Sequence, residues 1–314
     1  MCARPGAALF AAVTMTALVC TGLAGGSGGQ RSIAPPVVSD AVERDSHYPA
    51  QLASLQITSH GSALNAILMI AAGPGPHPTV MLLHGFPGYE GLLDVGEAMR
   101  RAGFNVLAFH YRGVWGSGGS FSFAHCVEDA AAAMESLRDP ASAKRGRVDA
   151  SRIYAVGHSM GGFVAVELAA RDPNVKGLAY ISGWDIGNDA ATWPATPPPA
   201  LVEDFRQSAL PTHGTSGAKL IREAMGHAAE WKLAKVASRI ADRPILMTFA
   251  EFEADDNPPA INHEPLRNAL VAAGARSLET RSFPTDHSYS DQRIALASAV
   301  VTWLQRVSGT TNKP

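Results

Sequence analysis

Short, unbroken apolar runs punctuate the chain and are separated by longer stretches with helical periodicity. The runs lie at residues 79–83, 152–156, 175–182 and 244–250, and a further strand is expected at 277–283. Runs of this length are typical of strands buried on both faces of a sheet. Helix candidates follow them at 92–102, 123–137, 163–171, 265–273 and 291–307. Alternating strands and helices predict a mostly parallel sheet with helices on both faces.

The first strands are expected to form a hairpin. Residues 52–58 and 63–70 flank the turn-like sequence Ser59-His60-Gly61-Ser62, which predicts an antiparallel pair at the sheet edge. Residues 25–49 are rich in Gly, Ser and Pro and are interpreted as a flexible lead-in. The folded domain is therefore expected to span 50–308, with 309–314 as a tail.

One long segment interrupts the alternation, at about 184–243. Connections of this length are usually functional lids or extra subdomains, so this one predicts a cap inserted after the sixth strand. It carries Trp184, Trp193 and Trp231. These side chains are candidates to line a substrate pocket, and the alternative is that they only pack the cap onto the core.

The amino terminus has the pattern of a secretory signal peptide. Arg4 is its only charge before Arg31, residues 7–19 form a short apolar run, and small residues precede a cleavage site near Ala24. Cys20 raises the alternative of a lipoprotein, although large residues stand before it. The run is shorter than the roughly 20 residues that span a bilayer. Residues 1–24 thus predict a secreted or periplasmic protein.

Composition narrows the function classes. The 314 residues are 46% hydrophobic, enough for one large α/β domain that buries about 75% of the unfolded chain's surface. The formal net charge is only −2, so the basic stripe of a nucleic-acid-binding protein is not expected. After signal cleavage Cys126 would be the only cysteine, in a helical run, and we expect it to be a small buried apolar residue.

The most informative motif is Gly157-His158-Ser159-Met160-Gly161-Gly162, between a strand and a helix. A strand, a sharp turn with serine at its tip and a helix describe a nucleophile elbow, where the flanking residues must be small. Downstream, an acidic loop at 251–259 and His287 each follow a predicted strand. Serine, acid and histidine therefore occur in that order at the carboxyl edge of the sheet, where ligands bind in open α/β folds.

The strand at 79–83 opens into His84-Gly85-Phe86, and with this motif the chain resembles the α/β-hydrolase family. The resemblance implies an α/β-hydrolase fold and an oxyanion hole made by the backbone N–H groups of Phe86 and Met160. His84 is expected to order the loop by hydrogen bonding. The catalytic base is expected to be His287 instead.

The same resemblance suggests the acid that would orient His287. Family members usually carry it a few residues past the seventh strand and shortly before a proline, and Asp255 fits this pattern best. Asp256 is a competitor and Glu253 a weaker one, since a shift of the loop would change the match. Asp286 precedes His287 directly and is expected to make a turn or face solvent.

Residues 104–119 resemble esterases and the catalytic domains of prolyl-oligopeptidases through Tyr111-Arg112-Gly113. Those proteins often carry Asp where this chain has His110, which puts any ion pair made by that Asp in doubt. The chain lacks room for the propeller of such peptidases.

Together these features predict a serine hydrolase that cleaves esters of a small substrate through an acyl-enzyme, with the triad Ser159, Asp255 and His287. The alternatives are a peptidase or amidase, and a catalytically silent protein that binds a ligand under the cap. No cofactor or metal is implied, because His263-Glu264 lacks the second histidine of a zinc helix. The oligomeric state stays open.

Overall fold

The computed structural model of the protein describes residues 37–40, 44–254 and 257–310. These residues belong to one compact unit, Ala34–Pro314. The predicted signal peptide at 1–24 and the first part of the lead-in lie outside the described residues. So do most of the carboxyl-terminal tail and the acid candidates Asp255 and Asp256.

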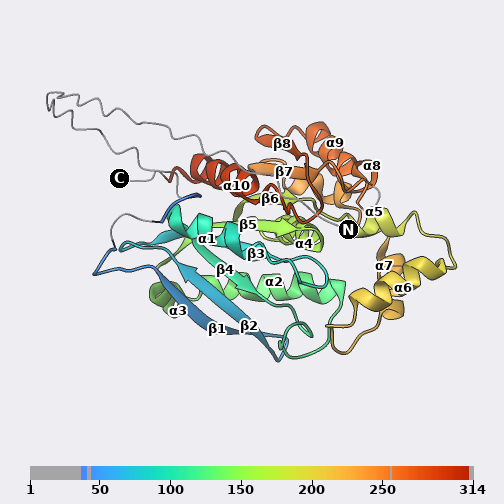
Figure 1. The fold of residues 1–314 in the computed structure, drawn as a ribbon, viewed down its shortest axis with the longest axis horizontal. Coiled ribbons are helices and arrows are strands. Elements are labelled where there is room, and N and C mark those ends of the chain that lie inside the picture. The colour runs from blue at the N-terminus through green and yellow to red at the C-terminus, as the bar shows by residue number, and fades with distance from the viewer. Residues whose placement is uncertain (1–36, 41–43, 255–256, 311–314) are drawn as a thin grey trace, which may run out of the picture. The chain divides into compact units, whose positions relative to one another are not determined.

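An eight-stranded sheet runs through the molecule in the order β1-β2-β4-β3-β5-β6-β7-β8 (Figure 1). The strands are β1 Gln51–Ser59, β2 Ser62–Ile70, β3 His77–Leu83, β4 Asn105–Phe109, β5 Val148–His158, β6 Val175–Ile181, β7 Ile245–Ala250 and β8 Leu278–Phe283. The hairpin of β1 and β2 is antiparallel and β2 pairs antiparallel with β4, whereas the strands from β4 to β8 are parallel. The predicted mostly parallel sheet and its edge hairpin are confirmed.

Helices cover both faces of this sheet. One face carries α1 (Leu93–Arg101) and α10 (Arg293–Ser308), whose apolar residues share a buried cluster with the sheet. The other face carries α2 Phe123–Arg138, α3 Pro140–Gly146, α4 Met160–Arg171 and α9 Glu264–Ala272, and the short α8 spans Pro259–Asn262. Because both faces are covered, the central strands are buried almost throughout, as their unbroken apolar runs predicted.

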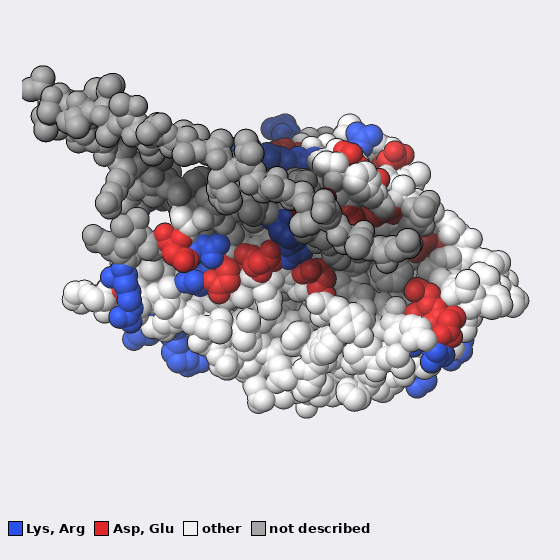
Figure 2. Space-filling view, viewed as in Figure 1, with Lys and Arg blue, Asp and Glu red and all other residues white. Residues whose placement is uncertain are grey.

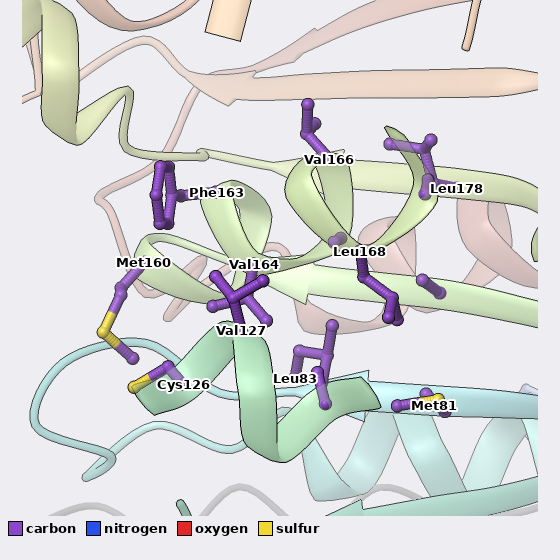
Figure 3. Packing of buried hydrophobic residues seen from close by; sticks show 14 of the residues in the cluster. Met81, Leu83, Cys126, Val127, Met160, Phe163, Val164, Val166, Leu168 and Leu178 are labelled. Carbon is purple, nitrogen blue, oxygen red and sulfur yellow. The ribbon is translucent and has the colours of Figure 1, made fainter. Parts of the chain in front are cut away.

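The contact between α2 and α4 lies within the larger buried cluster. Figure 3 shows Val127 of α2 beside Val164 of α4, with Cys126 near Met160 at the helix start. Cys126 is a free thiol without solvent exposure, and burial raises its pKa well above the usual value. The prediction that it is a small buried apolar residue is confirmed, and a raised pKa leaves it unreactive.

The segment between β6 and β7 is a helical insertion. It contains α5 Ile186–Ala190, α6 Pro199–Ser208, α7 Gly217–His227 and the 3-10 helix η1 Leu233–Arg239. Glu223 of α7 reaches the start of α2, where its carboxylate accepts hydrogen bonds from the N–H groups of Phe123 (3.1 Å) and Ala124 (3.0 Å). A carboxylate at a helix N-terminus satisfies unpaired donors and complements the helix dipole. The insertion is thereby attached to the core fold.

Candidate active site

Ser159 occupies a sharp turn between β5 and α4. Its backbone has φ 56° and ψ −123°, a conformation that non-glycine residues rarely adopt and that costs on the order of 1–3 kcal/mol. A Cβ at Gly157 would lie 2.0 Å from the carbonyl oxygen of Gly161, and one at Gly161 would lie 2.0 Å from that of Leu83. Both flanking positions therefore admit only glycine, as the motif predicted.

Hydrogen bonds on both sides hold the strained turn. The N–H of Ser159 donates to the carbonyl oxygen of Ile181 in the neighbouring strand, at 3.0 Å. The carbonyl of Ser159 accepts from the N–H groups of Gly162 (2.9 Å) and Trp184 (3.0 Å). Strained residues persist only where the surroundings over-determine them, and here strand, helix and insertion all contribute.

The turn after β3 lies directly against Ser159. A Cβ at Gly85 would come within 2.9 Å of the Cβ of Ser159, so only glycine lets the two segments approach this closely. His84 lies behind the turn, and its Nδ1–H donates to the carbonyl of Gly85 at 2.7 Å. The prediction that His84 orders this loop is confirmed. Burial lowers the pKa of His84 to about 4, so it is neutral at pH 7.

The two predicted oxyanion donors are sequence neighbours of the two residues that approach here, Gly85 and Ser159. Phe86 directly follows Gly85, and Met160 is the first residue of α4. The first four N–H groups of a helix have no acceptor within that helix. The N–H of Met160 therefore has no acceptor within α4.

The histidine of the last loop is paired with a glutamate. Nδ1 of His287 lies 2.5 Å from Oε2 of Glu253, which follows β7 and is 1% exposed. The carboxylate accepts the Nδ1 proton, which leaves Nε2 as the basic nitrogen. The sequence favoured Asp255 and Asp256, which lie outside the described residues, and placed Glu253 last. Among the described residues, Glu253 is the carboxylate that contacts the imidazole.

Glu253 has its own set of donors. Its Oε1 accepts from the hydroxyl of Ser182 at 2.8 Å and from the N–H of Ala250 at 3.0 Å. The Ser182 hydroxyl also lies 3.0 Å from that of Tyr289, which lies 2.8 Å from the hydroxyl of Thr248. Burial alone would raise the pKa of Glu253, but hydrogen bonds and the charge of His287 outweigh it and lower the pKa. The carboxylate is therefore ionised at neutral pH.

His158, which the sequence did not single out, fixes the loop of His287. Its Nε2 donates to the carbonyl of His287 at 2.8 Å, and the two ring centroids are 4.7 Å apart. Burial, followed by the charge of His287, lowers the pKa of His158 to about 3. A neutral imidazole beside Ser159 in the chain thus ties the histidine loop to the serine turn. Its position inside the Gly-X-Ser-X-Gly motif was the signal that could have identified it.

An aromatic cluster connects the Gly85 turn with the insertion. Phe86 packs on Phe121 (ring centroids 5.3 Å apart) and on Phe205 of α6 (6.2 Å). Two of the predicted pocket tryptophans join it, because Trp184 and Trp193 lie 6.2 Å and 5.5 Å from Phe205.

Trp231, the third of those tryptophans, has different neighbours. It is buried, packs on Phe163 of α4 at 5.5 Å, and stacks on His227 at 4.4 Å. These contacts agree with the interpretation that it packs the insertion onto the core.

Arg112 forms ion pairs with two carboxylates of α2. Its Nε donates to Asp129 of α2 at 2.6 Å, its N–H donates to the same carboxylate at 2.7 Å, and it also pairs with Glu128.

Asp286 makes a turn, as expected, by accepting from the N–H of Ser290 at 2.9 Å. Among the described residues no group of three or more His, Cys, Asp or Glu could hold a metal ion. No helix in the described ranges is long and apolar enough to cross a bilayer.

A mostly parallel eight-stranded sheet with a serine in a strained strand-to-helix turn defines an α/β-hydrolase. The profile of the family described as "Serine aminopeptidase, S33" matches residues 74–252, more than half of the chain. The chain belongs to this family of α/β-hydrolases, which confirms the resemblance inferred from the motifs.

Individual relatives match only part of the chain or share little sequence identity with it. Cutinase est2 of Thermobifida alba is 31% identical over 120 residues, which are 37% of this chain and 38% of the cutinase. The match thus spans little more than a third of that relative. Est1E from Butyrivibrio proteoclasticus, solved with ferulic acid bound, has a TM-score of 0.64 at 20% identity and covers 81% of this chain and 99% of its own. The acylaminoacyl peptidase of Pyrococcus horikoshii has a TM-score of 0.61 at 13% identity, and the match covers 84% of this chain and 43% of the peptidase. Both structures share the fold.

Proposed function

We propose that this protein is a serine hydrolase that cleaves carboxylic esters of small substrates through an acyl-enzyme. One observation carries the proposal. His287 is held from two sides, by the buried Glu253 at Nδ1 and by His158 at its backbone carbonyl. Since His158 directly precedes Ser159, its hydrogen bond ties the loop of His287 to the strand end that carries Ser159, which supports an approach of the basic nitrogen to the serine hydroxyl.

In the proposed mechanism the hydroxyl of Ser159 attacks the ester carbonyl while Nε2 of His287 takes its proton. Glu253 holds the imidazole in the required tautomer and stabilises its protonated form. The N–H groups of Phe86 and Met160 bind the oxyanion, and one such donor typically contributes about 100-fold to 1000-fold in turnover. Protonated His287 then gives its proton to the departing alcohol, and a water activated in the same way releases the acid and restores Ser159.

Ester hydrolysis is favoured over peptide hydrolysis by the relatives and by the insertion. Cutinases are among the curated matches, and a fold neighbour that this chain covers almost completely was solved with ferulic acid. The peptidase neighbour is covered for only 43% of its length. Phe86, Phe205 and Trp193 form an aromatic wall next to the Gly85 turn, which suits an apolar acyl or alcohol group.

The test compares the protein with Ser159→Ala and His287→Ala on short p-nitrophenyl esters. Both variants are expected to lose hydrolysis while circular dichroism stays unchanged. Full activity of Ser159→Ala would overturn the proposal. Equal rates on aminoacyl amides and acyl esters would favour the peptidase alternative.

A fluorophosphonate probe separates the enzyme from a silent binding protein. The probe is expected to label the protein at Ser159 and to leave Ser159→Ala unlabelled, because only an activated serine hydroxyl reacts. An unlabelled wild-type protein that still binds ligands would support a catalytically silent fold.

A further inference from the structure

The indole of Trp115 contacts the turn that carries Phe86, the proposed oxyanion donor. Its Nε1–H donates to the carbonyl oxygen of Pro87 at 3.1 Å. The same indole meets the ring of Tyr89 edge to face, with centroids 5.4 Å apart. Trp115 lies in the loop between β4 and α2, whereas the turn lies between β3 and α1. The hydrogen bond therefore joins two loops that are separate in the sequence.

Two rings close on Gly88 at the end of this turn. A Cβ at Gly88 would lie 2.8 Å from Nε1 of Trp115 and 2.8 Å from Cε1 of His84, so a side chain there would push the rings apart. His84 also binds the carbonyl of Gly85. The turn is therefore held at two of its carbonyls, by the imidazole at Gly85 and by the indole at Pro87.

Holding these two carbonyls restricts the direction of the N–H of Phe86. That N–H and the carbonyl of Gly85 belong to one planar peptide group, so a partner that fixes the carbonyl also fixes the N–H. The carbonyl of Pro87 lies two peptide groups further along the chain. Each residue has only two soft backbone torsions. With both carbonyls held, the torsions of Phe86 and Pro87 between them have little freedom.

Packing of the core does not explain Trp115. The residue is 40% exposed, and its backbone has φ 47°, in the left-handed region that bulky residues rarely adopt. Residues in such conformations persist only where the surroundings hold them, and they cluster at functional sites. An exposed indole N–H can also bond to water, so burial does not require the bond to Pro87.

Hydrogen bonds to β2 hold the loop of Trp115. The side-chain amide of Asn65 donates to the carbonyl of Trp115 at 3.4 Å. The N–H of Asn65 donates to the hydroxyl of Ser117 at 2.9 Å. Residues 113–119 carry no charge, and Figure 2 shows the lower middle of the visible face, where Figure 1 draws the hairpin of β1 and β2, largely without charged side chains. The contacts described for this loop are thus neutral hydrogen bonds, which attach Trp115 to the sheet.

We propose that Trp115 is a positioning residue for the oxyanion hole, which holds the turn of Phe86 in place through the carbonyl of Pro87. The inference rests on the proposed serine-hydrolase function and adds a residue outside its triad and its donors. Trp115 acts through the turn and does not touch the reacting atoms. A donor stabilises the developing negative charge only if it is aligned beforehand. Loss of the indole N–H is therefore expected to affect the tetrahedral state and not the binding of the ester.

The test measures kcat, KM and the affinity for phenylboronic acid in the full-length protein. A boronic acid adds to an activated serine as an analogue of the tetrahedral state, so its affinity reports how well the donors are aligned. Trp115→Phe keeps an aromatic ring and removes the N–H. It is expected to lower kcat and weaken boronate binding in parallel, by about 3-fold to 10-fold, the range of one neutral hydrogen bond. KM and the melting temperature are expected to stay unchanged.

Tyr89→Phe is the matched control, because it alters the ring that touches the indole and leaves the bond to Pro87 in place. It is expected to behave like the wild type. Equal losses in the two variants would assign the effect to the aromatic pair and reject the role of the hydrogen bond. An unchanged kcat in Trp115→Phe would overturn the inference. A raised KM with kcat and boronate affinity intact would also overturn it, since Trp115 would then be a substrate contact.

Ser159→Ala in the same assay separates this inference from the proposed function. A fully active Ser159→Ala would reject the serine-hydrolase mechanism itself. An inactive Ser159→Ala beside a fully active Trp115→Phe would reject only the role of Trp115.

Discussion

The carboxylate of Glu253 and Nδ1 of His287 lie 2.5 Å apart at the carboxyl edge of the sheet, in the loops that follow β7 and β8. The two strands are neighbours in parallel, so their loops leave the sheet side by side. The glutamate is buried and the histidine is half-buried. This pairing makes Glu253 the proposed orienting acid.

Glu253→Gln is expected to lower kcat by about 10³-fold to 10⁴-fold, because the amide keeps the shape but no longer holds the imidazole in the right tautomer. Initial rates on p-nitrophenyl butyrate measure the effect. Asp255→Asn and Asp256→Asn are the controls and are expected to retain activity. Loss of activity in Asp255→Asn together with a fully active Glu253→Gln would return the role to the aspartate.

Ser182 is expected to act through Glu253 as a positioning residue. Its hydroxyl donates to the ionised carboxylate, and hydrogen bonds to charged groups contribute about 1.5–3 kcal/mol. Ser182→Ala should therefore reduce kcat by roughly 10-fold to 100-fold, since 1.4 kcal/mol is tenfold, with little change in KM.

Tyr289→Phe is the comparison for Ser182, because it keeps the bond between Ser182 and Glu253 and removes only the outer hydroxyl. Its effect on kcat should be smaller than that of Ser182→Ala. If Ser182→Ala raised KM and left kcat unchanged, the result would contradict a role of Ser182 in orienting Glu253.

His263 is expected to make the protein less stable in mild acid. Burial lowers its pKa from 6.5 to about 4, and neither ring nitrogen has a partner among the described residues. Between pH 6.5 and 4 this histidine is protonated in the unfolded chain but stays neutral in the folded protein. The free energy of unfolding should therefore fall with decreasing pH, by up to about 1.4 kcal/mol per pH unit for this one group.

His263→Phe removes the titrating group while keeping an aromatic ring against Tyr180 and Phe249. Urea unfolding at several pH values should give a shallower pH dependence for the variant by about one proton. An unchanged slope would show that His263 titrates normally in the folded state.

Gly161 and Gly226 should respond in opposite ways to alanine. A Cβ at Gly161 meets backbone at 2.0 Å, whereas one at Gly226 in α7 has nothing within 4 Å. Gly161→Ala is expected to destabilise by more than about 3 kcal/mol, the upper end of ordinary overpacking. Gly226→Ala should stabilise by about 0.5–1 kcal/mol, because alanine loses less backbone entropy in a helix. Thermal unfolding measures the stability of both variants. A Gly161→Ala variant as stable as the wild type would contradict the elbow geometry.

Most elements of the sheet and its flanking helices were predictable because their signals are local. Apolar runs gave the buried strands, and helical periodicity gave α1, α2, α4, α9 and α10. The helix α3 was missed, although Asp139 as its cap and Pro140 at its first position are a start signal. The helices of the insertion were not assigned from the sequence, since their apolar faces are recognisable only once they are seen packed against α2 and the aromatic cluster.

Within the site, the sequence alone determined the strained turn of Ser159, because Gly157 and Gly161 act on neighbours a few bonds away or on the adjacent strand. It also determined that His84 binds its own loop, a contact between adjacent residues. Tertiary structure decided which carboxylate meets His287, since 34 positions separate Glu253 from it and a loop can turn any of several side chains inward.

The same reason separates the remaining assignments. Trp184 and Trp231 look alike in sequence, yet one lies in the cluster around Phe205 and the other packs on Phe163. The rings of His84 and His110 meet only because β3 and β4 are neighbours in the sheet. Short-range sterics and hydrogen bonds are encoded residue by residue, whereas contacts between distant loops depend on how the whole sheet and its insertion pack.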